Sequence, residues 1–396
     1  MPNYIDIFAG CGGLSLGLYN AGWRGLFAIE KNDMAFETLK YNLIEQNQHF
    51  AWPEWLPQTN HDINEVLIKF KKELKSLRGQ IDLVAGGPPC QGFSMAGKRK
   101  QKDARNKLIH SYVKFVGLTR PRMILFENVK GFTLAFKQKN KKGKPYSEVV
   151  LDALKKIGYK DARGEIINFS EFGVPQKRER FIIIGTLDNR ADEFFNGLFK
   201  NKTHFLASKE LKAKIGVGAA ISDLYKQNGL VDSPDSKGFK AGQYSPIKNN
   251  YQKLLRQFVD NNAIPDSHRF VNHNPDTVGI YEDLLVHAER DAPICDELKQ
   301  ELGINKRNLT VLDYTKPSPT LMSIPDDYVH YFEPRVLTVR EYARIQSFPD
   351  WFKFRGKYTT GGKRRKHEVP RYTQIGNAIP PLFAEHVGNV LKELVN

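Results

Sequence analysis

The chain has 396 residues, with 60 Lys and Arg against 44 Asp and Glu, so its formal net charge is +16. This length suffices for two folding units, and the charge favours a polyanionic partner, nucleic acid before a membrane. Three scattered cysteines (Cys11, Cys90 and Cys295) argue against a disulfide framework and a zinc site; we expect no metal and a reducing, cytoplasmic location.

The first 187 residues alternate short apolar runs with helical patterns, which is typical of βαβ units around a parallel sheet. We predict strands at residues 4–8, 26–30, 81–85, 123–127, 162–167 and 181–186. We also predict helices at 107–118 and 148–157, and a solvated basic loop at 135–146. Strand-like sequence begins by Tyr4, so we expect no signal peptide, and no apolar run approaches the roughly 18 residues of a membrane span.

The first predicted strand leads into a glycine-rich turn, Asp6–Gly13 (DIFAGCGG), and a helix near Leu14. Such a turn allows a ligand to approach the backbone closely. Glu30 ends the next strand roughly 20 residues later, where a carboxylate can accept hydrogen bonds from ribose hydroxyls. The departure from G-x-G-x-x-G favours an adenosine ligand without a pyrophosphate over NAD. Asp62 could accept from an adenine amino group, although capping a helix at 64–77 is the commoner role for such a residue.

Cys90 stands on a stiff loop, Gly87–Ser94 (GPPCQGFS), directly after the third predicted strand. Open α/β sheets place their active sites at the carboxyl ends of strands, although a lone cysteine is more often a buried structural thiol. Glu127 ends the fourth predicted strand and would face the same crevice, unless it is a solvated or capping group. The thiol and the carboxyl group together predict a reactive site at this edge of the sheet.

A polar run, Gln176–Arg180 (QKRER), precedes the last predicted strand. On an extended segment Gln176, Arg178 and Arg180 share one face; surface charge is the plain alternative, but forked arginines suit a planar polar target. A thiolate can add to carbon 6 of cytosine when a nearby acid protonates nitrogen 3, and carbon 5 then attacks an electrophilic methyl group. Cysteine, carboxylic acid and arginine therefore fit the methylation of a cytosine that has been flipped out of the duplex.

At these residues the chain resembles the DNA (cytosine-5)-methyltransferase family over nearly its whole length. Six motifs occur in the family's order: DIFAGCGG (6–13), GPPCQGFS (87–94), ENV (127–129), QKRER (176–180), REYARIQSFP (340–349) and QIGNAIP (374–380). The resemblance implies a Rossmann-like α/β fold with a mixed sheet, helices on both faces and a smaller, irregular target-recognition domain. We expect a catalytic, cofactor-binding domain at 1–190 and 368–396, target recognition at 191–335, and a hinge or bracing segment at 336–367.

The resemblance also implies a role for each site residue. Cys90 would be the nucleophile and Glu127 the acid that contacts the cytosine, while Arg180 holds the carbonyl oxygen of the base and Arg178 organises the site. The S-adenosylmethionine pocket would be lined by Phe8, Gly10, Gly12, Glu30, Asp62, Ile63, Pro89, Leu108 and Asn377. A mobile loop that closes over DNA would contribute Gln91, Ser94, Lys98 and Arg99.

The implied activity is transfer of a methyl group from S-adenosylmethionine to carbon 5 of a cytosine in a specific duplex DNA sequence. The chain starts at the first motif and stops just after the last, so we expect a standalone bacterial type II modification enzyme, monomeric on DNA. It would protect DNA from a cognate restriction endonuclease that need not bind it. Three alternatives fit the sequence less well. A nicotinamide-dependent dehydrogenase would leave the Cys90 loop unexplained, and an RNA methyltransferase would depart from the 176–180 pattern. A DNA-binding module with a decayed catalytic domain would not keep every residue type that the chemistry needs.

Overall fold

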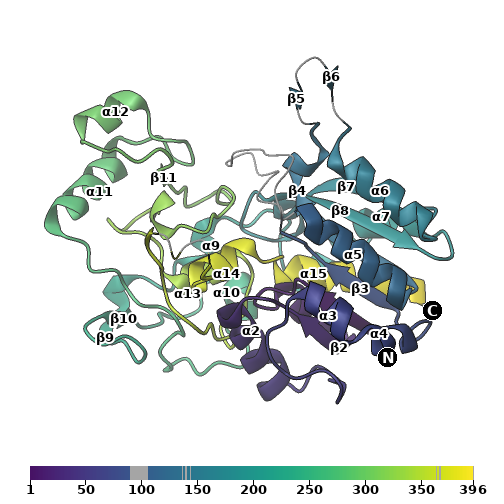
Figure 1. Cartoon of the computed structure of the whole chain (residues 1–396). Helices are drawn as coiled ribbons and strands as arrows, with labels where there is room; N and C mark the ends of the chain where they lie inside the picture. The colour runs from purple at the N-terminus through teal and green to yellow at the C-terminus, as the bar shows by residue number, and fades with distance from the viewer. Residues whose placement is uncertain are drawn as a thin grey trace. The chain divides into compact units, whose positions relative to one another are not determined.

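The computed structural model describes residues 1–89, 106–135, 137–138, 141–142, 144–362, 364 and 367–395 (Figure 1). The chain divides into two compact units. Unit 1 comprises Met1–Phe169, Glu179–Thr203 and Phe383–Asn396, and unit 2 comprises Ser170–Arg178 and His204–Leu382. These boundaries differ from the expected domains, because the segments 170–178 and 336–382 belong to unit 2 and the segment 191–203 belongs to unit 1.

Unit 1 is built on a six-stranded sheet in the order β2-β1-β3-β4-β8-β7. Its strands are β1 (Asn3–Ile7), β2 (Arg24–Ile29), β3 (Leu83–Gly86), β4 (Met123–Val129), β7 (Arg163–Asn168) and β8 (Glu179–Thr186). The first four run parallel, whereas β8 is antiparallel to both β4 and β7. The predicted strands and the mixed α/β class are therefore confirmed, and a parallel arrangement holds only for β1–β4.

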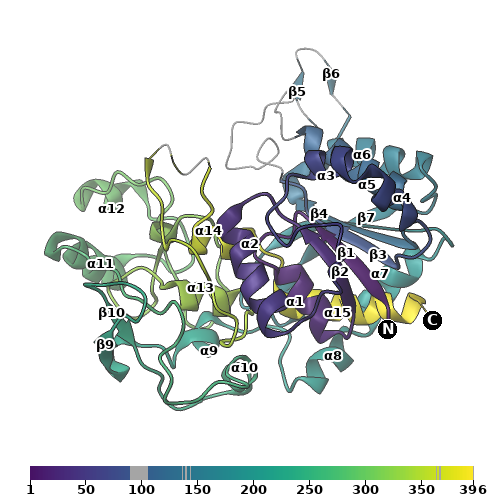
Figure 2. The same cartoon turned by 60° about the horizontal axis from the view of Figure 1, so that its bottom comes forward.

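Helices cover both faces of this sheet (Figure 2). One face carries α3 (Ile63–Lys69), α4 (Lys71–Ser76), α5 (Asn106–Thr119) and α6 (Tyr146–Lys156). The other carries α1 (Gly13–Asn20), α7 (Ala191–Lys200) and α15 (Pro381–Val395). Strands enclosed on both sides need apolar residues on both faces, and β3 is accordingly buried along its whole length. The helix expected at 64–77 is interrupted at Phe70, which ends α3 and precedes α4.

Two further segments of unit 1 depart from simple expectation. The helix α2 (Asp33–Leu39) continues into a π-helix, η1 (Lys40–Gln46). The basic segment expected to be an open loop contains a short antiparallel pair, β5 (Lys137–Gln138) with β6 (Lys141–Lys142). Single-turn 3₁₀ helices also occur, at η2 (Lys130–Thr133) in unit 1 and at η3 (Phe169–Phe172), η4 (Lys226–Asn228) and η5 (Pro325–Asp327) further along the chain.

Unit 2 consists of short elements joined by long irregular connections, as the loss of sequence periodicity predicts. Its helices are α8 (Lys202–Ser208), which begins at the end of unit 1, α9 (Val217–Ile221), α10 (Asn250–Leu255), α11 (Pro275–His287), α12 (Asp296–Glu301), α13 (Val339–Ile345) and α14 (Arg371–Asn377). Its strands form two small pairs, antiparallel β9 (Leu230–Asp232) with β10 (Lys240–Gly242) and parallel β11 (Thr310–Val311) with β12 (Tyr328–Val329).

The segment expected to be a hinge forms the polar core of unit 2. Arg344 of α13 is fully buried and pairs with Asp223 and with Asp350, whose Oδ2 lies 2.7 Å from Arg344 Nη2. The helix α14 joins this core because Tyr372 donates a 2.7 Å hydrogen bond to the Leu337 carbonyl and Gln346 donates a 2.9 Å bond to that of Ile375. These contacts explain why residues 368–382 belong to unit 2. Among the described residues, no helix combines the length and apolarity needed to cross a bilayer.

Candidate active site

The sheet brings Glu127 and Arg180 together, although 53 positions separate them in the sequence. They lie on neighbouring antiparallel strands, where Val129 pairs with Arg180 and Glu127 pairs with Ile182. Arg180 Nε lies 2.9 Å from Glu127 Oε1, and the side chains are only 12% and 13% exposed. An ion pair with so little solvent contact is weakly screened, so the carboxylate is held in one orientation at the end of β4.

The loop that leads to Cys90 lies against this carboxylate. A Cβ atom added at Gly87 would lie 2.6 Å from Glu127 Oε2, which only a glycine avoids. The next strand residue, Asn128, donates through Nδ2 to the Pro88 carbonyl at 3.4 Å. Contact with β4 thus continues as far as Pro88 through the Asn128 side chain, and Pro89, which follows, is exposed. The predicted residues Cys90, Gln91, Ser94, Lys98 and Arg99 lie outside the described residues.

The predicted cofactor turn joins β1 to α1 through three residues in the left-handed region of backbone space. Phe8, Gly10 and Gly12 have φ values of 63°, 57° and 93°. Glycine adopts this conformation freely, but a phenylalanine there carries strain of order 1 kcal/mol, a feature that clusters at ligand sites. A Cβ added at Gly10 would meet nothing within 4 Å, so the turn borders open space. At Gly12 the same atom would meet Leu43 at 3.1 Å, so Gly12 is needed for packing on the π-helix.

Glu30, at the end of β2, is tied to this turn by its carboxylate. Oε2 accepts the Gly10 N–H at 2.9 Å and Oε1 accepts the Asn32 N–H at 2.7 Å. Burial raises the pKa of Glu30, although these N–H bonds oppose the rise. The Lys31 N–H also bonds to this carboxylate. Its two oxygens offer about four lone pairs, so at least one remains to accept a hydroxyl donor beside the open space at Gly10.

The remaining residues predicted for the pocket in unit 1 have structural partners. Asp62 caps α3, because its Oδ1 accepts the Asn64 N–H at 2.8 Å, and its Oδ2 pairs with Lys31 at 2.9 Å. The capping interpretation of Asp62 is therefore confirmed, and a contact with adenine stays a prediction. Ile63 is 2% exposed and belongs to the main apolar core, and Leu108 packs partly buried against the same core.

Arg178 and Asn377 both belong to unit 2, where Arg178 contacts the residue that precedes Asn377. Arg178 is 2% exposed and donates through Nη2 to the Gly376 carbonyl at 2.8 Å. Asn377 follows as the exposed last residue of α14. Gln176 is fully buried and accepts the Leu321 N–H at 3.1 Å. The surface-charge alternative is therefore wrong for Gln176 and Arg178.

Sequence reasoning did not assign a role to Asp6 or to Gly87. Asp6 lies in β1 beneath the glycine turn, is 1% exposed, and accepts a 2.6 Å hydrogen bond from Ser15 Oγ. Burial raises the pKa of Asp6 to about 7. An acid inside an otherwise apolar strand is the sequence signal that would have marked Asp6, and paired glycines before two prolines would have marked Gly87.

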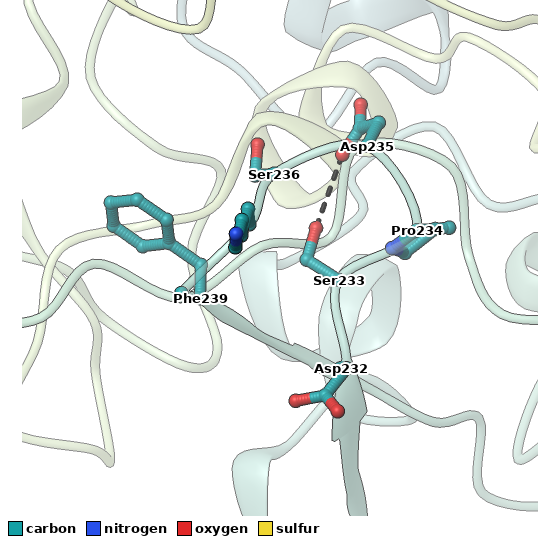
Figure 3. A pocket seen from close by; sticks show the side chains of 8 residues that line it. Asp232, Ser233, Pro234, Asp235, Ser236 and Phe239 are labelled. Atoms are coloured by element: carbon teal, nitrogen blue, oxygen red, sulfur yellow. Dashed lines mark hydrogen bonds between the residues drawn. The ribbon is translucent and has the colours of Figure 1, made fainter.

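A hollow of about 640 Å³ lies in the turn between β9 and β10, well away in sequence from these residues (Figure 3). A single stretch, residues 232–239, lines it, and Ser233 donates to Asp235 there at 3.1 Å. None of the predicted site residues belongs to this stretch. Asp232 pairs with Lys240 and Asp235 pairs with Arg371, and we assign this hollow no part in the site.

Comparison with known proteins identifies the family of this chain. Residues 3–393 match the family model of C-5 cytosine-specific DNA methylases. The type II methyltransferase M.DdeI of Desulfomicrobium norvegicum is 30% identical over 97% of this chain and 86% of its own length. M1.HphI of Haemophilus parahaemolyticus is also 30% identical, over 99% and 87%.

A solved structure extends the likeness to three dimensions. A prophage-encoded protein of E. coli, assigned as a DNA modification methyltransferase, has a TM-score of 0.67 and 25% identity, and both chains are covered completely. The family match over residues 3–393 and the two relatives lead to one conclusion. This chain belongs to the family of C-5 cytosine-specific DNA methylases and is a DNA (cytosine-5) methyltransferase.

Proposed function

We propose that this enzyme methylates carbon 5 of a cytosine flipped out of a specific duplex DNA sequence, through a covalent adduct with Cys90. The observation that carries the proposal is the contact between the Gly87–Pro89 loop and the Glu127 carboxylate, which Arg180 holds at 2.9 Å. Cys90 follows this loop in the sequence, three positions after Gly87. The proposal places its thiol beside the oriented acid and the guanidinium group. A cytosine ring needs these three groups at carbon 6, nitrogen 3 and the carbonyl oxygen.

In the proposed reaction Glu127 takes up a proton and gives it to nitrogen 3, while the Cys90 thiolate forms a bond to carbon 6. Arg180 donates to the carbonyl oxygen of the base, and Arg178 organises the site. After carbon 5 has gained the methyl group from the sulfonium sulfur of the donor, leaving a neutral thioether, a water molecule or hydroxide ion removes the carbon 5 proton. The electrons of that bond restore the 5,6 double bond and expel the Cys90 thiolate, and nitrogen 3 returns its proton.

The residues around the glycine turn fit S-adenosylmethionine as the methyl donor. When bound, this cofactor supplies the electrophilic methyl group. Open space at Gly10, the strained Phe8 and the available lone pairs of Glu30 support a ribose and methionine site at this turn. Gly12, Asp62, Ile63, Pro89, Leu108 and Asn377 complete the proposed pocket.

We assign most of the catalytic and cofactor chemistry to unit 1, apart from the roles of Arg178 and Asn377, and target recognition chiefly to unit 2, with Gln91, Ser94, Lys98 and Arg99 contacting DNA. The bacterial relatives named as type II methyltransferases support a role in restriction–modification. The enzyme would then act as a monomer in a bacterial cytoplasm and protect the sites that a cognate endonuclease cleaves.

Two measurements test the reaction. Transfer of tritiated methyl groups should be seen with duplex DNA and not with transfer RNA, and Cys90→Ala should abolish it while S-adenosylmethionine still binds. A duplex with 5-fluorocytosine at the target should form an adduct that survives denaturation, because fluorine replaces the proton that must be removed. Wild-type protein that methylates normally without forming this adduct would contradict the covalent mechanism.

A further inference from the structure

Unit 2 carries a group of aromatic rings at its surface, here called the aromatic ridge: Tyr225, Tyr314, Tyr331 and Phe332. Phe332 is 56% exposed and Tyr314 is 52% exposed, whereas Tyr331 lies beneath them at 8%. The ring centroids of Tyr225 and Phe332 are 5.3 Å apart, and those of Tyr314 and Tyr331 are 5.2 Å apart. Clustered apolar surface of this kind marks an interaction site more often than scattered exposed residues do.

The backbone around Tyr314 is shaped to hold its exposed ring. Gly218 of α9 donates its N–H to the Tyr314 carbonyl at 2.9 Å, and a Cβ at Gly218 would lie 2.2 Å from the Tyr314 ring. At Gly216 a Cβ would lie 2.5 Å from the Thr315 carbonyl oxygen. Two glycines therefore allow α9 to support the Tyr314 turn closely, and the ring is positioned in advance of any contact.

A separate set of hydrogen bonds holds the backbone at Phe332. Buried His330 accepts the N–H groups of Phe332 and Glu333 on its Nδ1, each at 3.0 Å. Burial lowers the pKa of His330 to about 3, so the ring is neutral and remains an acceptor at physiological pH. Beneath Phe332, the hydroxyl groups of Tyr225 and Tyr331 are 2.8 Å apart. The backbone at Phe332 and the two phenol hydroxyl groups are thus held by hydrogen bonds, while the rings of Phe332 and Tyr314 are exposed to water.

The charge around the ridge favours an anionic partner. Lys226, Lys248 and Lys316 are exposed, and Lys248 Nζ lies 5.2 Å from the centre of the Tyr225 ring. Two acids are also close, but each has a cationic partner: Glu333 pairs with Arg335 at 2.6 Å and Asp313 with Lys316 at 3.2 Å. Lys226 and Lys248 therefore remain to neutralise phosphates beside the aromatic rings.

We propose that the aromatic ridge is a DNA-contact surface of this methyltransferase. Phe332 and Tyr314 would pack against deoxyribose and base edges in a groove, while Lys226 and Lys248 meet the adjoining phosphates. Aromatic rings give apolar contact at a low ordering cost, and lysines give the salt-dependent part of the affinity. This inference rests on the proposed action on duplex DNA and adds the residues that grip it.

The test uses full-length protein and a 30-base-pair duplex carrying the context that the wild type methylates in a host, found by bisulfite sequencing. We expect Phe332→Ala and Tyr314→Ala each to weaken binding of this duplex at least about fivefold, as loss of a ring contact usually does. Tyr314→Phe, which keeps the ring, should bind like the wild type. The control is Phe258→Ala, which removes an 84% exposed ring from the turn after α10.

Lys248→Gln should lower the salt dependence of binding by about one phosphate contact. Thermal unfolding and S-adenosylmethionine binding should be unchanged in the Phe332 variant, which separates a lost DNA contact from lost folding. If the wild type methylates DNA and both ring variants bind DNA with unaltered affinity, the proposed role of the ridge is wrong and the proposed function stands. If the wild type does not methylate DNA, the proposed function itself is wrong. A wild-type dimer that Phe332→Ala converts to monomers without loss of DNA affinity would identify the ridge as a contact between copies.

Discussion

Replacing Gly87 by alanine should damage catalysis, because the structure leaves no room for a side chain there. The added Cβ would lie 2.6 Å from Glu127 Oε2, against an ordinary contact of at least 3.4 Å, so the loop or the carboxylate must move by about 0.8 Å. The carboxylate resists movement because Arg180 holds its other oxygen at 2.9 Å. Misplacing a reacting group by about 1 Å costs on the order of 10²-fold in rate, and overpacking costs about 1–3 kcal/mol of stability.

The assay is steady-state transfer of tritiated methyl groups to plasmid DNA, together with urea unfolding. We expect the turnover number of Gly87→Ala to fall about 10²-fold. The matched control is Gly117→Ala in α5, where an added Cβ meets nothing within 4 Å. That variant should gain up to about 1 kcal/mol of stability through helix propensity and keep its activity.

A Gly87→Ala enzyme that unfolds cooperatively and turns over within twofold of wild type would refute the reasoning. It would mean that the loop before Cys90 does not depend on its contact with Glu127. A loss confined to the affinity for DNA, with turnover intact, would also count against a role of this contact in positioning the acid.

Three other predictions concern the cofactor turn, the core of unit 2 and the partner. Gly10→Ala and Gly79→Ala should introduce similar backbone strain, because their φ values are 57° and 80° and open space surrounds both positions. Only Gly10→Ala should weaken the binding of S-adenosylmethionine, at least tenfold by calorimetry. Equal affinities of the two variants would place the cofactor elsewhere. Burial alone would raise the pKa of Glu341, but the ion pair with Arg335 outweighs burial and lowers this pKa to about 2. The ionised Glu341 therefore stabilises the fold above pH 4.5, and this contribution to stability is lost as the pH falls toward 2. Glu341→Gln should cost about 3–5 kcal/mol in urea at pH 7 and should lose less between pH 4.5 and 2 than the wild type; parallel pH curves would contradict this. DNA affinity should fall steeply with salt because phosphate contacts release counterions, and a flat dependence would make the +16 charge incidental.

The sequence by itself determined the family, the reaction class and most of the sheet. Each of these rests on local order along the chain: apolar runs bounded by glycine and proline predicted the six strands, and six short motifs in a fixed order identified the family. The glycine turn and Glu30 were also readable, because a turn and the strand that follows it are a local pattern. Asp62 showed the limit of such reading, since its capping role is as local as its expected role in the pocket.

Tertiary structure alone decided which distant residues meet. The antiparallel register of β4 and β8 places Arg180 against Glu127, and close backbone approach makes Gly87 indispensable beside that carboxylate. Periodicity also said nothing of the segment 336–382, because buried ion pairs such as Arg344 with Asp350 look like surface charge in a sequence. A sequence lists the groups that a reaction needs, but the distances and burial that make those groups work together depend on contacts between strands and loops far apart in the chain.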